Sequence, residues 1–165
     1  MYAGIVVDTN NFINKAGVRT FEAAAYLRRN GADVTRVRKM LRDDINDYKA
    51  RAAAVSDAEI FAQSYAISVC PSEALDSPTV VGAQAVNELL NIVGVKASFV
   101  LTPYKGEIYV SARSIDEVNV QVIMERFGGG GHMTIAGAQL KDCTVVEAKE
   151  LVKYTVTKIV EEGDI

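Results

Sequence analysis

The sequence predicts a fold of the α/β type, more narrowly α+β: a mixed, mostly antiparallel sheet with flanking helices, preceded by a strand and two helices. Strand-like and helix-like periodicities alternate over residues 57–165 in the order β-α-β-β-α-β-α. Within that stretch, Lys105-Gly106 separates two alternating segments, as in a hairpin. We expect the helices to cover one side of the sheet. The pattern changes near residues 52–57, so we assign residues 1–55 and 56–165 to two domains.

The first part begins with an apolar run, Ala3–Val7, that is typical of a buried strand. A buried strand needs neighbours on both sides and is an unusual first element. Left unpaired, it would favour association with a second copy of the chain, so the sequence is compatible with a homodimer. Thr20 can then cap a helix that Gly31 ends, and helical periodicity over residues 33–55 predicts a second, longer helix.

The second part is predicted from its periodicity and its turn residues. Its last helix has the strongest local signal, because Thr144 and Glu147 have the spacing of a capping box. The predicted elements are a strand over 59–70, a helix over 79–95, a hairpin over 96–114, a helix over 115–127, a strand over 138–143 and a helix over 144–162.

Composition limits the classes of function. The 165 residues are 49% hydrophobic and 24% charged, a balance that provides enough apolar side chains for a core. The formal net charge is −3 and the pI is about 5.2. No overall positive field is therefore present to hold duplex DNA or an anionic membrane surface.

Cysteine usage and the absence of targeting signals indicate the compartment. Cys70 and Cys143 are isolated, without C-x-x-C spacing, and are interpreted as reduced intracellular thiols. The sequence contains neither a signal peptide nor an apolar run near 18 residues. We therefore expect a cytoplasmic location.

The glycine run Gly128–Gly131, directly before the single histidine His132, is the strongest candidate site. A linker is the simpler interpretation, but linkers are usually polar and lie between domains. Successive glycines can instead direct several N–H groups at one anion, more effectively where a helix follows. The residues after His132 fit a helical turn or a strand. We expect Gly130 to need a positive φ and to exclude a β-branched residue. His132 can donate to a phosphate or stack on a base, or it can be structural.

Arg113 is the second candidate, because it ends a predicted strand shortly before the helix that leads to the glycines. Its planar fork of donors suits a phosphate. The alternative is a structural ion pair with Asp116 or Glu117, and the sequence does not decide between the two.

These motifs resemble those of the DHH phosphoesterases. The segment "SARSIDEVNVQVIMERFGGGGHMTIAGAQL" is similar to the signature of the DHHA1 domain, and "AGIVVDTNNF" with "RTFEAAAYLRRNGAD" resembles the end of the DHH domain. Together they cover almost the whole chain. The combination is most similar to cyclic-di-AMP phosphodiesterases of the GdpP type. The resemblance implies residues 1–55 as the C-terminal fragment of a DHH domain and residues 56–165 as a DHHA1 substrate-binding domain.

The resemblance also implies a chemistry for the parent protein, namely hydrolysis of cyclic-di-AMP to pApA at a two-metal centre, usually manganese. Asp8 matches one metal ligand, whereas the Asp-His-His triplet and two further motifs are absent, so that no complete catalytic set is present. Relatives carry membrane helices ahead of the DHH part, which implies an anchored parent. The substrate-binding residues that the resemblance implies are Ser111, Arg113, Gly129, Gly130, Gly131 and His132, with Arg19 as a further structural or substrate contact.

Two other functions stay open. Relatives in the same superfamily degrade short oligonucleotides or adenosine 3′,5′-bisphosphate. DHHA1-like domains also serve as nucleotide- or RNA-binding modules without chemistry, and the missing motifs favour that function for this chain taken alone. The sequence departs from the family over Ile13–Ala16 and Met133–Ala138, which puts base recognition in doubt but not the binding of phosphate.

Overall fold

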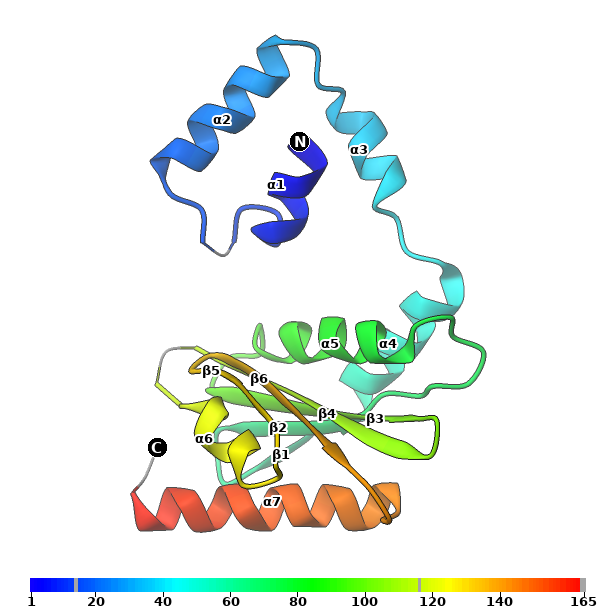
Figure 1. Ribbon diagram of the computed structural model, residues 1–165, viewed down its shortest axis with the longest axis vertical. Helices are drawn as coiled ribbons and strands as arrows, with labels where there is room; N and C mark the ends of the chain where they lie inside the picture. The colour runs from blue at the N-terminus through cyan, green and yellow to red at the C-terminus, as the bar shows by residue number, and fades with distance from the viewer. Residues whose placement is uncertain (14, 116, 164–165) are drawn as a thin grey trace. The chain divides into compact units, whose positions relative to one another are not determined.

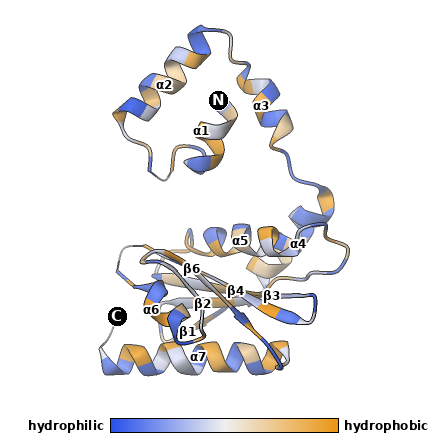
Figure 2. Cartoon of the chain, in the orientation of Figure 1, coloured by the Kyte–Doolittle hydropathy of each residue, from blue (hydrophilic) through white to orange (hydrophobic). Residues whose placement is uncertain are grey.

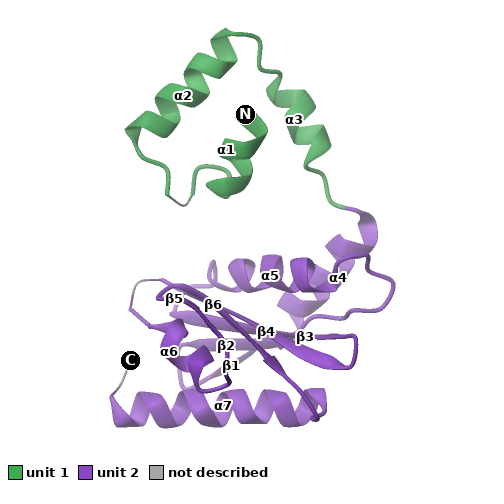
Figure 3. Cartoon of the chain, in the orientation of Figure 1, with its two compact units in different colours: residues 1–43 green, residues 44–165 purple. Residues whose placement is uncertain are grey.

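The computed structural model describes residues 1–13, 15–115 and 117–163, which form two compact units of residues 1–43 and 44–165 (Figure 3). Among these described residues, no helix is both long and apolar enough to cross a membrane. The second unit begins at Asp44, because the helix that follows it packs on the sheet domain. The domain boundary placed at residues 55 and 56 stays a prediction.

The first unit contains α1 (Tyr2–Asp8), α2 (Val18–Arg29) and α3 (Val34–Met40) (Figure 1). The prediction of a strand at Ala3–Val7 is wrong, because these residues form α1. A helix satisfies its backbone groups internally, as when the Ile5 N–H donates to the Met1 carbonyl at 3.1 Å, whereas a strand needs a partner strand. The homodimer was inferred from this unpaired strand, so that inference loses its basis.

The helices of the first unit carry hydrophobic as well as hydrophilic residues (Figure 2), but few of the hydrophobic ones are buried. Neither α1 nor α3 has a buried residue, and in α2 only Ala24 is buried. Phe21 and Tyr26 are 53% and 66% exposed. Folded stability in this chain must therefore come mainly from the second unit.

The single helix expected over residues 33–55 is two helices, α3 and α4 (Ile45–Ser56). Asp44 separates them, because its backbone is extended (φ −66°, ψ 154°) and its side chain accepts from the Asn46 N–H at 2.8 Å. An aspartate in this position is an N-cap, which starts a new helix rather than continuing an old one.

The second unit is built on one six-stranded sheet of order β1-β2-β3-β4-β6-β5. Only β2 and β3 are parallel, so the predicted mixed, mostly antiparallel sheet is confirmed. The strands are β1 (Glu59–Phe61), β2 (Tyr65–Val69), β3 (Ala97–Tyr104), β4 (Glu107–Ser114), β5 (Gly130–His132) and β6 (Ile135–Leu140).

The hairpin expected over 96–114 is confirmed as β3 and β4, joined by Lys105 (φ 52°) and Gly106 (φ 79°). Two positive φ angles match the twist of the flanking strands, as in a type I′ turn. The single strand expected over 59–70 is wrong. Positive φ angles at Ala62 and Gln63 turn the chain, so that β1 and β2 pair as a hairpin.

Helices cover both faces of the sheet, contrary to the one-sided arrangement expected (Figure 1). The parallel pair β2 and β3 needs a crossover, which α5 (Pro78–Leu89) provides over one face. The helices α6 (Val120–Glu125) and α7 (Val145–Glu162) cover the other face. Two buried clusters result, one on each side of the sheet.

An arginine that joins two helices, and a capping box, fix the helices. The Arg51 guanidinium joins α4 to α5, with its Nε 2.6 Å from Glu88 Oε1 and an NH1 group donating to Gln84 Oε1 at 2.9 Å. The predicted capping box is confirmed, because the Thr144 hydroxyl accepts from the Glu147 N–H and the Glu147 carboxylate accepts from the Thr144 N–H. This bonding lowers the pKa of Glu147 below its ordinary value.

We expect Phe99→Ala to lower the free energy of unfolding by roughly 3–5 kcal/mol, because Phe99 is fully buried between the sheet and α7. The matched control Phe21→Ala removes the same ring from a position in α2 that is 53% exposed and stacked on Phe12, with ring centroids 5.3 Å apart, and should cost only about 0.5–1.5 kcal/mol. Urea unfolding measures both. Equal losses in the two variants would contradict this placement of the core.

Candidate functional site

The candidate site lies on the sheet face that α5 covers only in part. Along β4, Ile108, Val110 and Ala112 are buried in the core against α6 and α7. The alternate residues, Tyr109, Ser111 and Arg113, point to the other face and are half-buried. Ser111 lies opposite Val100 of β3, which packs against α5, so this is the α5 face of the sheet.

Strands β6 and β5 extend this face in register. Cross-strand pairing sets Gln139 opposite Tyr109, Gly137 opposite Ser111 and Ile135 opposite Arg113, and then Gly130 opposite Gly137 and His132 opposite Ile135. Directly opposed residues in an antiparallel pair share a face. We call this surface the glycine trough; its residues are Tyr109, Ser111, Arg113, Gly130, His132, Ile135, Gly137 and Gln139.

A hollow of about 560 Å³ lies over one end of the trough, where Tyr109, Ser111, Gly137 and Gln139 line it. Thr79 in the first turn of α5 forms one side of it. Because glycines expose only backbone, they leave room at the floor that any other residue would fill. Its other lining residues include Tyr109, Ser111, Gly129, Gly137 and Gln139.

The glycine run ends one helix and does not begin another. The Gly128 and Gly129 N–H groups donate to the Glu125 and Met124 carbonyls at 3.0 and 2.9 Å, which completes the last turn of α6. Gly130 then starts β5. Two of the four N–H groups are thus already bonded and no helix N-terminus follows, so the expected anion nest of successive N–H groups is wrong in that form.

Two of these glycines are required by close packing. A Cβ at Gly129 would lie 2.2 Å from the Gly137 carbonyl oxygen, and one at Gly131 would lie 2.4 Å from that of Ile135. A Cβ at Gly130 would meet no atom within 4 Å, and Gly130 does not have the positive φ that we expected. Gly129 and Gly131 let β5 approach β6, while Gly130 keeps the trough open.

Arg113 is a half-buried cation without a carboxylate partner in the part of the chain that the structure describes. One of its N–H groups donates to the Ala112 carbonyl at 2.9 Å. Of the two predicted partners, Glu117 pairs with Lys96 at 2.7 Å, and Asp116 lies outside the described residues. Burial removes water from the guanidinium and lowers its pKa. An anion at this point would restore part of the lost solvation.

His132 is exposed at the edge of the sheet, two strands from Arg113 along one row. Its Cα is therefore about 10 Å from that of Arg113, a span that one phosphate and its sugar can bridge. The structure thus brings Ser111, Arg113, Gly130 and His132 onto one face. It places Gly129 at the hollow and directs Gly131 against β6. Their role in binding substrate stays a prediction.

Sequence reasoning missed Thr79, Tyr109 and Gln139. Alternation along β4 could have found Tyr109, because it is two residues from Ser111. Gln139 and Thr79 join the site only through strand register and helix packing, which no local pattern encodes.

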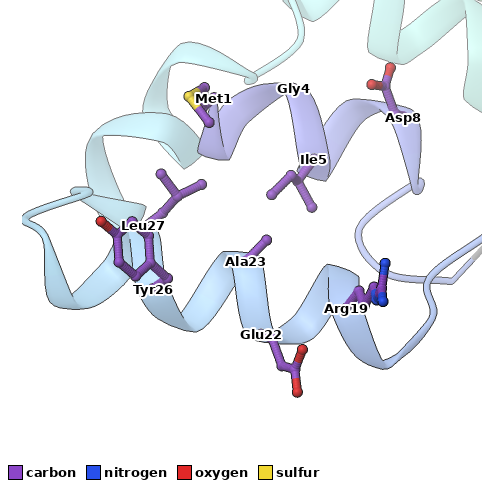
Figure 4. Close-up of a pocket in the computed structure, with 9 residues that line it drawn as sticks. All are labelled: Met1, Gly4, Ile5, Asp8, Arg19, Glu22, Ala23, Tyr26 and Leu27. Carbon is purple, nitrogen blue, oxygen red and sulfur yellow. The ribbon is translucent and has the colours of Figure 1, made fainter.

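Asp8, the predicted metal ligand, lies in the first unit at the exposed end of α1. With Arg19 and Glu22 it borders a hollow of about 650 Å³ between α1 and α2, and its carboxylate points away from Ile5 and Ala23 (Figure 4). Over residues 1–13, 15–115 and 117–163, no three His, Cys, Asp or Glu residues gather into a group that could hold a metal ion. One carboxylate does not fit a two-metal centre.

Comparison with known proteins gives the family. Residues 62–162 match the DHHA1 domain. The chain is 45% identical over 151 residues to the cyclic-di-AMP phosphodiesterase PdeA of Listeria monocytogenes, covering 91% of this chain and 23% of that protein. It is 44% identical over 164 residues to the cyclic-di-AMP phosphodiesterase GdpP of Geobacillus thermodenitrificans, covering 99% of this chain and 25% of that protein. The chain therefore spans about a quarter of the length of these relatives.

A solved structure has the same fold. The exopolyphosphatase-related protein from Bacteroides fragilis superposes with a TM-score of 0.80 at 20% identity, covering 94% of this chain and 48% of that one. The match covers nearly the whole chain, which agrees with the mixed fold described above.

We expect Gly129→Ala to lower the free energy of unfolding by roughly 1–3 kcal/mol, because its Cβ would push β5 away from the Gly137 backbone. The matched control Gly130→Ala has open space and an ordinary φ, so stability should be unchanged or higher by up to about 1 kcal/mol. Thermal unfolding compares the two. A larger loss in Gly130→Ala than in Gly129→Ala would contradict the packing of β5.

Proposed function

We propose, since the chain belongs to the DHHA1 domain family, that it binds a phosphate of an adenine dinucleotide within a phosphodiesterase that opens cyclic-di-AMP to pApA. The observation that carries the binding role is Arg113, a half-buried cation that shares a sheet face with Gly130 and Gly137 and has no carboxylate partner among the described residues. The relatives, both cyclic-di-AMP phosphodiesterases, support the reaction and the substrate.

The proposed contacts follow from the trough. Arg113 donates from its planar fork to phosphate oxygens, the Ser111 hydroxyl adds one hydrogen bond, and His132 closes the site from the edge strand. We assign no phosphate contact to the Gly130 backbone. Gly130 is needed because it has no side chain and so leaves the trough open. Gly129 and Gly131 act by holding β5 against β6.

The hydrolytic step needs groups beyond those in this chain. We propose manganese as the metal of the parent protein, on the strength of the family resemblance, with Asp8 as the one ligand that this chain offers. The other ligands, and any membrane anchor, would belong to the rest of a parent about four times as long, as in the relatives. This chain would then supply substrate binding.

We expect the 165-residue chain to show no manganese-dependent hydrolysis, because one carboxylate cannot hold two metal ions. Incubation with cyclic-di-AMP and manganese, followed by chromatography, tests this. Formation of pApA above a metal-free control would contradict the proposed division between binding and hydrolysis.

Binding should persist without metal. We expect pApA to bind with a Kd of about 0.1–1 mM and to shift NMR signals of the trough. Arg113→Gln should weaken this binding roughly tenfold or more, because it removes charge-assisted hydrogen bonds. Gly130→Val should also weaken it, by filling the trough without unfolding the chain. His132→Ala should reduce it about three- to tenfold.

The matched control for the charge is Arg36→Gln, which removes an exposed guanidinium from α3 in the other unit. Its binding should equal that of the unchanged chain. Equal affinities for Arg113→Gln and Arg36→Gln would overturn the assignment of the phosphate to Arg113.

A further inference from the structure

We infer that Tyr109 and Gln139 form a nucleobase subsite at the uncharged end of the glycine trough, in which Tyr109 stacks on the base and Gln139 selects adenine over guanine. The inference rests on the proposed function, since it takes the ligand to be a nucleotide. It goes further by naming which residues distinguish one base from another.

The distribution of charge along the trough sets the direction of the ligand. Arg113 lies at one end, with no carboxylate beside it among the described residues. At the other end, Lys141 is paired with Glu107 at 3.0 Å, so that its charge is balanced. A ligand with an anionic phosphate and a neutral base therefore lies with its phosphate toward Arg113 and its base toward Tyr109 and Gln139.

The spacing along the strands fits such a ligand. Arg113, Ser111 and Tyr109 follow one another on β4 at steps of two residues, or about 7 Å each. Between them, Gly137 and Gly130 leave the neighbouring strands without side chains, so a ligand can lie flat across the sheet. Tyr109 and Gln139 are directly opposite each other, and both line the hollow.

The polar groups at this end of the hollow are available to a ligand. The Gln139 amide, the Thr79 hydroxyl and the Ser111 hydroxyl make no hydrogen bond over the described residues. Neighbouring hydroxyls of the same sheet do: Ser98 donates to the Val86 carbonyl at 2.7 Å and Ser114 to that of Val118 at 2.6 Å. The unbonded polar groups of Gln139, Thr79 and Ser111 thus gather at the hollow, whereas the Ser98 and Ser114 hydroxyls are used internally.

The chemistry of an amide favours adenine. A glutamine side chain offers a donor and an acceptor side by side, which matches the exocyclic amine and ring nitrogen of adenine. Guanine presents two acceptors on the corresponding edge and would leave the glutamine carbonyl facing an oxygen. An aromatic ring beneath the base adds stacking without distinguishing bases. Tyr109 lines the hollow, and the Tyr104 ring packs beside it with ring centroids 6.2 Å apart.

Metal-free NMR titrations of the 165-residue chain with pApA and with pGpG test the inference. The unchanged chain should bind pApA more tightly and shift the side-chain amide signals of Gln139. In Gln139→Arg the preference should fall or reverse by roughly ten- to a hundredfold, because arginine pairs with the two acceptors of guanine. Tyr109→Ala should weaken both ligands about fivefold or more, while Tyr109→Phe, which keeps the ring, should bind as the unchanged chain does.

The matched control is Gln63→Arg, the same substitution at an exposed turn between β1 and β2, at the opposite edge of the sheet. It gains the same charge and should keep the preference for pApA. If pApA binds but Gln139→Arg behaves as Gln63→Arg does, the base subsite is overturned and the proposed function stands. If neither dinucleotide binds the unchanged chain, the base subsite and the proposed function are both overturned.

Discussion

The register of β6 between β4 and β5 is the constraint on which the site depends. Side chains alternate along a strand, so a slip of one residue would turn Gln139 into the core and bring Leu140 to the trough. The register is held by what β6 buries: Ala136, Ala138 and Leu140 pack with α6 and α7. The small alanines also let β5 come close, because Gly129 and Gly131 lie directly against them. Core packing on one face thus fixes recognition on the other.

Local signals in the sequence predicted local structure well. The hairpin of β3 and β4 and the capping box of α7 each depend on two residues near in the chain, Lys105-Gly106 and Thr144 with Glu147. The strand expected at Ala3–Val7 failed because apolar composition alone cannot tell a strand from a short helix without knowledge of neighbours. The one strand expected over 59–70 failed because Ala62 and Gln63 are not typical turn residues.

The site was predictable only in part, for a related reason. Residues with distinctive chemistry, Arg113 and His132, could be chosen from the sequence, and the structure brings them onto one face. The role of the glycines could not be predicted from the sequence. The sequence drew attention to all four, yet the structure divides them among the end of α6, the approach of β5 to β6 and the open floor. Gln139 carries no special pattern, and only cross-strand pairing sets it opposite Tyr109.

The proposed contacts have a consequence for catalysis by a parent enzyme. Arg113, Ser111, Tyr109 and Gln139 would hold a phosphate and a base, and neither group needs to change when a neighbouring phosphodiester bond is cut. Contacts that are equally strong before and during the reaction lower KM without raising kcat. The linear product keeps the same phosphate and base, so the trough would hold it about as well as the substrate. In the proposed enzyme, acceleration would come from the metal-binding groups and from the positioning of the bond to be cut, to which this domain would contribute.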